Sequence, residues 1–406
     1  MYFPRLIEQN FKKALRNFPA VFVGGPRRAG KTMLVRHLLK GYDYILLDEM
    51  DVRSFAASDP KEFLERHKPP VIIDEIQNVP QLLSYIKARI EKDKTPGQWV
   101  LTGSQQWALM KGIGETLAGR IAITHLYPFS ISEILKDNKK QPAGTDSYLR
   151  NLQTAKKLPE RSLPLEDWII TGGYPEVVLG KKEARKLWFS SYMQTYIDRD
   201  VRGNIKEVNL RDFERFVRLL AARTAQQLNA STLASEVGVT VPTIKSWLTL
   251  LEASGLIFFL APYHKNLGKR IIKAPKCYFM DTGLVCYLVG LQEATHALQG
   301  PMAGALFETA CVAQIFKRLA LWGDEQAMYY FRSSDGLEVD VLIERAGRCT
   351  PMEIKLSSTI DQGRVRNLKK WMELNKDASA ESFVISSSKE VGAIGGKVSN
   401  IHFSLL

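Results

Sequence analysis

The sequence is poor in cysteine and lacks any long apolar run. Its four cysteines, Cys277, Cys286, Cys311 and Cys349, never approach the short spacing of a zinc site, so we expect buried thiols. No stretch nears the length of a bilayer span, and the first residues do not form a charged start followed by an apolar signal core. These absences predict a cytoplasmic protein without a membrane partner.

Acidic residues are fewer than basic ones. The chain has 43 Asp and Glu against 56 Lys and Arg, which gives a formal net charge of +13. This excess favours a polyanionic partner, although many basic proteins have no such partner. A chain of 406 residues, 45% of them hydrophobic, has room for about two to four domains with buried cores.

An apolar segment at residues 21–23 is followed by a glycine-rich loop and then by a helical pattern. This order is typical of a Walker A phosphate loop, so we expect ATP or a related nucleotide to bind here. The glycines let the backbone turn its amide groups towards the α and β phosphates. Lys31 would lie along the β and γ phosphates, and the Thr32 hydroxyl would coordinate Mg²⁺. The predicted nucleotide-binding residues are Gly25, Pro26, Arg27, Arg28, Ala29, Gly30, Lys31 and Thr32.

A second apolar strand, at residues 70–73, ends in Asp74 and Glu75. This is the pattern of a Walker B motif, in which Asp74 would hold Mg²⁺ through water. Glu75 would polarise the attacking water and is, with Lys31, a candidate catalytic residue. The alternative is a strand that ends in a solvated acidic pair.

Two further strands are expected at residues 98–104 and 117–124. Ligands of open α/β sheets bind at the carboxyl ends of the strands, so Thr102 and Ser104 are candidate sensors of the γ phosphate. A structural role for these hydroxyls is equally open. Arg120 is a candidate catalytic finger, within this chain or towards a neighbouring subunit, unless it pairs with an acidic surface group.

These motifs occur together, in the same order, in one known family. The segments GPRRAGKT, VIIDEIQNVP, LTGSQQ, LAGRI and GGYPE resemble the prokaryotic AAA-type ATPases that carry a C-terminal domain of unknown function. The resemblance covers nearly the whole chain. It implies a parallel sheet with a small helical lid, Pro175 near the adenine, ATP and Mg²⁺ as cofactors, and a homo-oligomer. Without the family, GGYP is a turn between two helices.

The middle of the chain changes character. Residues 231–251 have the pattern of a helix, a glycine turn and a second helix, and Ser231 is expected to cap the first helix. Two short apolar segments, at 257–260 and 271–272, are expected to form the strands of a wing. This order predicts a winged-helix module, whose second helix and basic wing would contact DNA. Alternatively, the module only packs domains or assembles subunits. The candidate DNA contacts are Thr243, Lys245, Lys265, Lys269 and Arg270.

The C-terminal part is expected to contain a helix from residue 304 and strands at 329–332, 337–343 and 351–356. Alternation places Glu353 and Lys355 on one face of the last strand. An acid on one strand and acid-x-Lys on the next resembles the PD-(D/E)xK nuclease fold. Carboxylates of Glu308, Asp340 and Glu353 would bind Mg²⁺, and Lys355 would orient the hydrolytic water. An inactive recognition fold remains an equal alternative.

Together these patterns predict an α/β protein in four parts. They are a P-loop NTPase core of the AAA type (residues 1–160), a helical lid (161–210), a winged-helix module (211–275) and a restriction-endonuclease-like α/β domain (276–406). ATP hydrolysis would move the lid and reposition the other parts on DNA. The rival hypotheses are a nucleotide-dependent switch that binds protein or DNA without cutting it, and an ATP-regulated nuclease.

Overall fold

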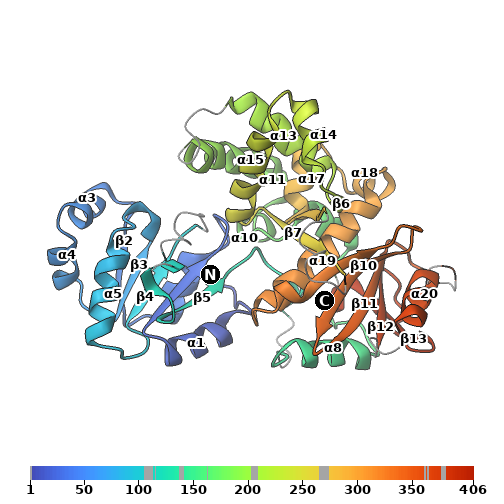
Figure 1. Cartoon of the computed structure of the whole chain (residues 1–406), viewed down its shortest axis with the longest axis horizontal. Helices are drawn as coiled ribbons and strands as arrows, with labels where there is room; N and C mark the ends of the chain where they lie inside the picture. The colour runs from blue at the N-terminus through green and yellow to red at the C-terminus, as the bar shows by residue number, and fades with distance from the viewer. Residues whose placement is uncertain are drawn as a thin grey trace. The chain divides into compact units, whose positions relative to one another are not determined.

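The computed structural model describes residues 2–104, 113–114, 116–136, 141–161, 163–202, 209–264, 274–360, 363, 365–375 and 381–406. Contacts divide the chain into two units. The first contains residues 1–128 and 253–255, and the second contains residues 129–252 and 256–406. In Figure 1 the first unit, apart from residues 253–255, is coloured from blue to cyan.

The first unit is built on a five-stranded parallel sheet with the order β2-β3-β4-β1-β5. All residues of the central strands β1, β3 and β4 are buried, because helices or loops cover both faces of a parallel sheet. The loop after β1 therefore opens in the middle of the carboxyl edge, where such sheets bind ligands. The strands are β1 (Ala20–Gly24), β2 (Asp43–Leu46), β3 (Val71–Asp74), β4 (Trp99–Thr102) and β5 (Ile121–His125).

Five described helices accompany this sheet. Their apolar sides share one core with the strands, in which Phe22, Phe63, Ile86 and Leu101 are fully buried. Burial of such side chains stabilises the unit by roughly 1.5–3 kcal/mol each. The helices are α1 (Glu8–Asn17), α2 (Lys31–Leu38), α3 (Met50–Ser58), α4 (Pro60–Arg66) and α5 (Leu82–Lys92), and a 3-10 turn follows β3 at Ile76–Asn78.

The second unit begins with short helices. The region predicted as the lid is helical, since it contains α9 (Leu165–Thr171), α10 (Pro175–Val178) and α11 (Arg185–Tyr196). Residues 129–160, which the sequence assigns to the first domain, lie in this unit with α7 (Ile131–Ile134) and α8 (Thr145–Thr154). One reason is a buried hydrogen bond of 2.8 Å from the Ile131 amide to the Gln314 side chain. The predicted domain boundaries stay predictions.

The predicted helix, glycine turn and helix are present as α14 (Ala230–Val237) and α15 (Val241–Ala253), packed beside α13 (Leu210–Ala222). Gly238 ends α14 in the left-handed region, with φ of 85°. The cap is Asn229, which accepts a hydrogen bond of 3.0 Å from the Thr232 amide. The expectation for Ser231 is wrong because the helix begins at Ala230. The apolar stripe is buried and consists of Leu233, Val237, Ile244, Trp247, Leu248 and Leu251.

The described strands of the second unit form a nine-stranded sheet with the order β13-β14-β12-β11-β10-β9-β7-β8-β6. Strand β7 pairs antiparallel with β8 and parallel with β9, so the strands after α15 continue into the C-terminal sheet. The strand expected at residues 271–272 lies outside the described residues. The strands are β6 (Gln226–Gln227), β7 (Ile257–Pro262), β8 (Lys276–Phe279), β9 (Met328–Arg332), β10 (Glu338–Arg345), β11 (Arg348–Lys355), β12 (Ser382–Ser386), β13 (Gly392–Gly395) and β14 (Val398–His402).

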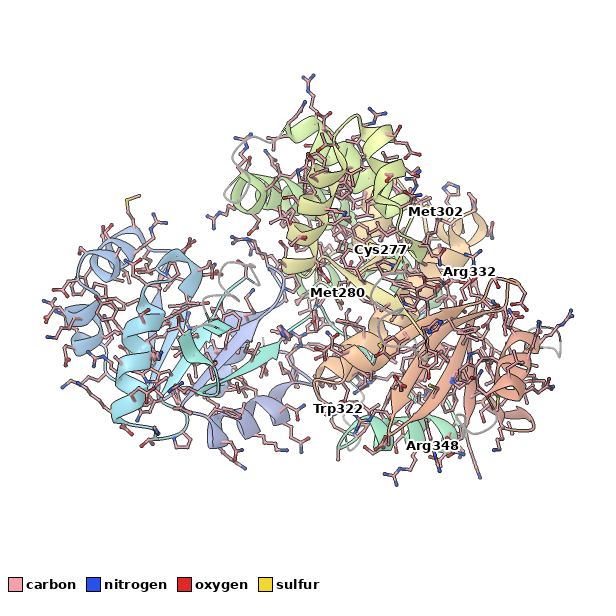
Figure 2. All side chains as sticks on the ribbon, viewed as in Figure 1. Cys277, Met280, Met302, Trp322, Arg332 and Arg348 are labelled. Atoms are coloured by element: carbon pink, nitrogen blue, oxygen red, sulfur yellow. The ribbon has the colours of Figure 1, made fainter. Side chains whose placement is uncertain are left out.

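The described helices that accompany the last strands are α17 (Thr282–Leu288), α18 (Ala294–Gln299), α19 (Ala303–Ala320) and α20 (Arg366–Leu374). Trp371 of α20 is fully buried in a core with Val339 and Val384. All four cysteines are buried and free, as predicted, and Cys277 is labelled in Figure 2. Within the described ranges, every helix is too short or too polar to cross a membrane.

Candidate functional site

The phosphate loop connects β1 to α2. Gly25 has a φ of 144°, and a Cβ atom at this position would clash with the backbone oxygen of Leu126. Gly30 has a φ of 98° and directly precedes Lys31, the first residue of α2. Both positions therefore require glycine, which permits the turn that directs the amide groups of the loop.

The Lys31 ammonium is folded back on the loop. Its Nζ donates to the carbonyl oxygens of Gly25, at 3.0 Å, and Pro26, at 3.1 Å, and the residue is 6% exposed. These carbonyls hold a buried positive charge that would otherwise be costly. A bound phosphate would offer the same ammonium a stronger, charged partner.

Arg5 is a buried residue of this site that the sequence analysis did not find. Its guanidinium donates to the backbone oxygens of Ala29, at 2.8 Å, and Tyr127, at 2.6 Å. It thereby ties the end of the phosphate loop to the segment that follows β5. No sequence signal marks this residue, since it lies outside the phosphate-loop motif and precedes Ala29 by 24 positions.

Asp74 is the centre of a hydroxyl cluster at the end of β3. Its Oδ2 accepts from the Thr32 hydroxyl and from the Tyr44 hydroxyl, both at 2.7 Å, and its Oδ1 accepts from Thr102. The structure thus brings together the two predicted ligands of Mg²⁺ from separate motifs. Tyr44 was not predicted, and burial, followed by the hydrogen bond to Asp74, raises the pKa of its hydroxyl. The Arg36 guanidinium lies 4.7 Å from the centre of the Tyr44 ring.

Glu75 lies in an uncommon backbone conformation, with a φ of 62°. Such left-handed geometry costs a non-glycine residue about 1 kcal/mol and points to a local constraint. The Gln77 side-chain amide donates to the Glu75 carboxylate, and the Glu75 amide donates to the Thr102 hydroxyl at 3.4 Å. In this state the candidate base is held by Gln77.

The other candidates lie at different places. Ser104 is buried, and its hydroxyl has no hydrogen-bonding partner within the described part of the chain. Arg120 precedes β5, at the opposite edge of the parallel sheet from the phosphate loop, and pairs with Glu91. The sensor role of Thr102 and Ser104 stays a prediction, as does the finger role of Arg120. Pro175 begins α10 in the second unit, and its contact with adenine also stays a prediction.

The candidate DNA contacts are only partly visible. Thr240 directly precedes α15, and its hydroxyl forms a hydrogen bond of 2.8 Å with the Thr243 hydroxyl. Thr243 is half-buried and Lys245 is exposed. The remaining candidates lie outside the described residues: Lys265, Lys269 and Arg270.

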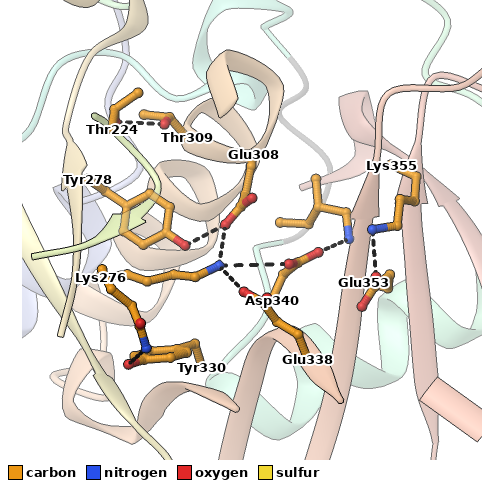
Figure 3. A network of polar contacts seen from close by, with 12 residues as sticks. Thr224, Lys276, Tyr278, Glu308, Thr309, Tyr330, Glu338, Asp340, Glu353 and Lys355 are labelled. Carbon is orange, nitrogen blue, oxygen red and sulfur yellow. Dashed lines mark hydrogen bonds and ion pairs between the residues drawn. The ribbon is translucent and has the colours of Figure 1, made fainter. Parts of the chain in front are cut away.

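The residues predicted for a nuclease site converge (Figure 3). Glu308 comes from α19, Asp340 from β10, and Glu353 and Lys355 from β11. The Lys355 ammonium lies 2.6 Å from Glu353, and Asp340 accepts from the Ile354 amide at 2.8 Å. Period-two alternation explains why Glu353 and Lys355 share a face. Among the residues that the structure describes, no three acidic, His or Cys side chains are arranged to hold a metal ion.

A lysine that was not predicted occupies the centre of these acids. The Lys276 ammonium, from β8, lies 3.0 Å from Glu308, 2.9 Å from Glu338 and 3.9 Å from Asp340. Its side chain is 5% exposed, and the Tyr278 hydroxyl also donates to Glu308, at 2.7 Å. We call Lys276, Glu308, Glu338, Asp340, Glu353 and Lys355 the acidic cluster.

Three carboxyl groups of the acidic cluster have raised pKa values. Burial, reinforced by the charge of Asp340, raises the pKa of Glu353 to about 8 and that of Glu308 to about 7. Burial also raises the pKa of Asp340, against the opposing effect of Lys276. The physical cause is that these three carboxyl groups share a poorly solvated space, in which burial disfavours the charged form.

The parallel sheet and the joined Walker motifs are those of a P-loop NTPase fold. Residues 17–135 match the family described as AAA domain. Residues 163–295 and 303–406 match two families described as domains of unknown function, DUF8612 and DUF4143. The chain thus contains a P-loop ATPase domain of the AAA type, which supports nucleotide binding and hydrolysis, and a C-terminal DUF4143 domain.

Similar proteins come from bacteria and archaea. Uncharacterized proteins of Mycobacterium tuberculosis and Mycobacterium bovis are each 26% identical to this chain over 349 residues, which are 86% of this chain and 73% of each relative. A solved structure, the Walker-type ATPase of Pyrococcus abyssi, has a TM-score of 0.43 and 16% identity. It covers 71% of this chain and 96% of that chain.

Proposed function

We propose that this protein binds and hydrolyses ATP with Mg²⁺ at the phosphate loop. The observation that carries this proposal is the hydrogen bond of 2.7 Å between Thr32 and Asp74. Hydroxyl and carboxylate oxygens are the ligands that Mg²⁺ prefers, so these residues fit the ion. Bound Mg²⁺ would offset negative charge on the phosphates.

Lys31 and Glu75 would carry out separate tasks. The Lys31 ammonium would leave its backbone carbonyls and bind the β and γ phosphates, while Thr32 and Asp74 hold the metal. Glu75 would orient the attacking water once its carboxylate leaves Gln77. The proposed cycle therefore includes a step in which the hydrogen bond between Gln77 and the Glu75 carboxylate breaks.

Phosphate release by purified protein tests the proposal. We expect Lys31→Ala to weaken nucleotide binding, and Glu75→Gln to keep binding but to slow hydrolysis by about 100-fold or more. Lys92→Ala, at an exposed lysine of α5, is the matched control and should behave as the wild type. Hydrolysis that both active-site changes leave intact would contradict the assignment.

DNA is the partner that the charge distribution favours. The net charge of +13 and the exposed Lys245 at the start of α15 support a winged-helix contact with DNA. Fluorescence anisotropy with a labelled duplex should show affinity that falls steeply with salt and that Lys245→Glu lowers further. Binding that is absent, or indifferent to salt, would remove DNA from the proposal. A homo-oligomer and a cytoplasmic location also stay predictions.

Metal-dependent cleavage of DNA is a second candidate function. The observation that favours it is the proximity of Asp340, Glu353 and Lys355 on the adjacent strands β10 and β11. Plasmid incubated with ATP and Mg²⁺ or Mn²⁺ should be cut by the wild type and left intact by Asp340→Ala and Lys355→Ala. An uncut plasmid under all these conditions would favour the rival hypothesis of a nucleotide-dependent switch.

A further inference from the structure

The Lys276 ammonium lies among the carboxylates of the acidic cluster, where a positive charge offsets their mutual repulsion. Its ammonium lies within 4 Å of three carboxylates. Dashed lines in Figure 3 join it to Glu308, Glu338 and Asp340. The same ammonium lies 5.7 Å from the centre of the Tyr330 ring. The Lys276 ammonium is therefore a buried cation that is surrounded by carboxylate oxygens and one aromatic ring.

One ammonium does not satisfy the acids around it. Lys355 pairs with Glu353, while the Lys276 ammonium lies within 4 Å of the other three carboxylates. Glu353 is 3% exposed, and its Oε2 has no hydrogen-bonding partner within the described part of the chain. Strand register places Asp340 opposite Glu353, since the neighbouring Val341 pairs with Met352 on the antiparallel strand. The cluster thus retains buried oxygen atoms that a cation of higher charge would satisfy.

The lysine and the acids come from different segments. Lys276 lies on β8, within residues 163–295, whereas all four acids lie within residues 303–406. Lysine has a long, flexible side chain, so its ammonium can move away from the acids while its backbone stays in place. Movement of β8, or of this side chain alone, would vacate the centre of the acids.

We propose that Lys276 is a built-in substitute for a divalent cation, and that Glu308, Asp340 and Glu353 bind such an ion when the ammonium leaves. The proposal rests on the cation-dependent role suggested above for the acidic cluster, and it adds a residue that controls access. A hard divalent ion such as Mg²⁺ or Mn²⁺ fits an all-carboxylate set. With the ammonium in place, repulsion between ion and lysine prevents loading.

Binding of Mn²⁺ to the full chain without nucleotide tests this control. The electron paramagnetic resonance signal of free Mn²⁺ would be followed for the wild type, Lys276→Met and Lys276→Met with Asp340→Asn. We expect Lys276→Met to bind Mn²⁺ at least about tenfold more tightly than the wild type, and the added Asp340→Asn to abolish that gain. Lys397→Met, at an exposed lysine of the same unit, is the control. A folded Lys276→Met protein with unchanged Mn²⁺ affinity would overturn the proposal.

Loss of Lys276 leaves buried carboxylates without their cation and can unfold the unit. The variant Lys276→Met with Glu338→Gln removes one charge of each sign and leaves the three proposed ligands. Its melting temperature should rise with Mn²⁺ by several degrees more than that of the wild type. An equal response of the two proteins would also overturn the proposal.

Plasmid cleavage separates this inference from the nuclease hypothesis. A gain of Mn²⁺ affinity without cleavage supports the control by Lys276 and contradicts cutting. If the wild type cuts plasmid and Asp340→Ala does not, while Lys276→Met gains no Mn²⁺ affinity, the nuclease hypothesis is supported and the control by Lys276 is contradicted.

Discussion

Replacement of Arg5 by methionine should weaken nucleotide binding although Arg5 is no part of either Walker motif. The guanidinium donates one hydrogen bond to Ala29, at the end of the phosphate loop, and another to Tyr127. Methionine has a similar length and can fill the space, but it donates nothing. The variant therefore isolates the hydrogen bonds from the packing.

The size of the effect follows from the two bonds. A hydrogen bond from a charged group contributes roughly 1.5–3 kcal/mol, so the loss of both should destabilise the first unit by about 3–6 kcal/mol. If only the bond to Ala29 is coupled to binding, affinity for ATP should fall about 10-fold to 100-fold. Arg5→Lys should recover part of this loss, because an ammonium can reach one carbonyl but lacks the planar fork.

Calorimetric titration with Mg-ATP and urea denaturation would measure both effects. Arg16→Met, at an exposed arginine of α1, is the matched control and should leave both unchanged. An Arg5→Met protein that binds and unfolds like the Arg16→Met protein would refute the idea that Arg5 braces the loop.

Three other predictions follow from the same structure. Gly25→Ala should abolish measurable binding of a fluorescent ATP analogue, since its Cβ would meet the Leu126 backbone; binding within about twofold of the wild type would disprove this. Tyr44→Phe removes a donor to buried Asp74 and should lower the free energy of unfolding of the first unit by about 1.5–3 kcal/mol in urea. Tyr85→Phe, at an exposed tyrosine, should change nothing. Burial raises the pKa of Glu353 from 4.5 to about 8, so the folded state keeps a proton that the unfolded chain releases. Stability of the second unit should therefore fall from about pH 5 to pH 8, and Glu353→Gln should flatten this slope by up to about 1 kcal/mol per pH unit; parallel slopes would contradict the argument.

Much of the backbone was predictable because its signals are local. Gly25 and Gly30 impose the turn of the phosphate loop within a few residues. The alternation around Glu353 and Lys355 likewise needs only the two-residue period of a strand. The strands expected at 329–332, 337–343 and 351–356 are present as β9, β10 and β11 with shifts of a few residues at their ends.

The partners of charged and polar groups were not predictable in this way. Tyr44 reaches Asp74 because β2 lies beside β3, and Lys276 reaches the acids because β7 joins β8 to β9. The spacing of residues along the chain predicts neither of these strand orders. The expectation of a metal among Glu308, Asp340 and Glu353 therefore overlooked the ammonium that the fold brings to them.

The amino-acid sequence settled the phosphate loop, the Walker B carboxylates and the apolar strands, since glycine geometry and burial patterns act over a few neighbouring residues. Folding in three dimensions decided that Arg5 secures the loop, that Tyr44 reaches Asp74, and that Lys276 lies among the carboxylates of the acidic cluster. Such contacts join atoms that are distant along the chain but a few ångströms apart in the folded protein. Poor solvation at these buried places strengthens the electrostatic interactions between them.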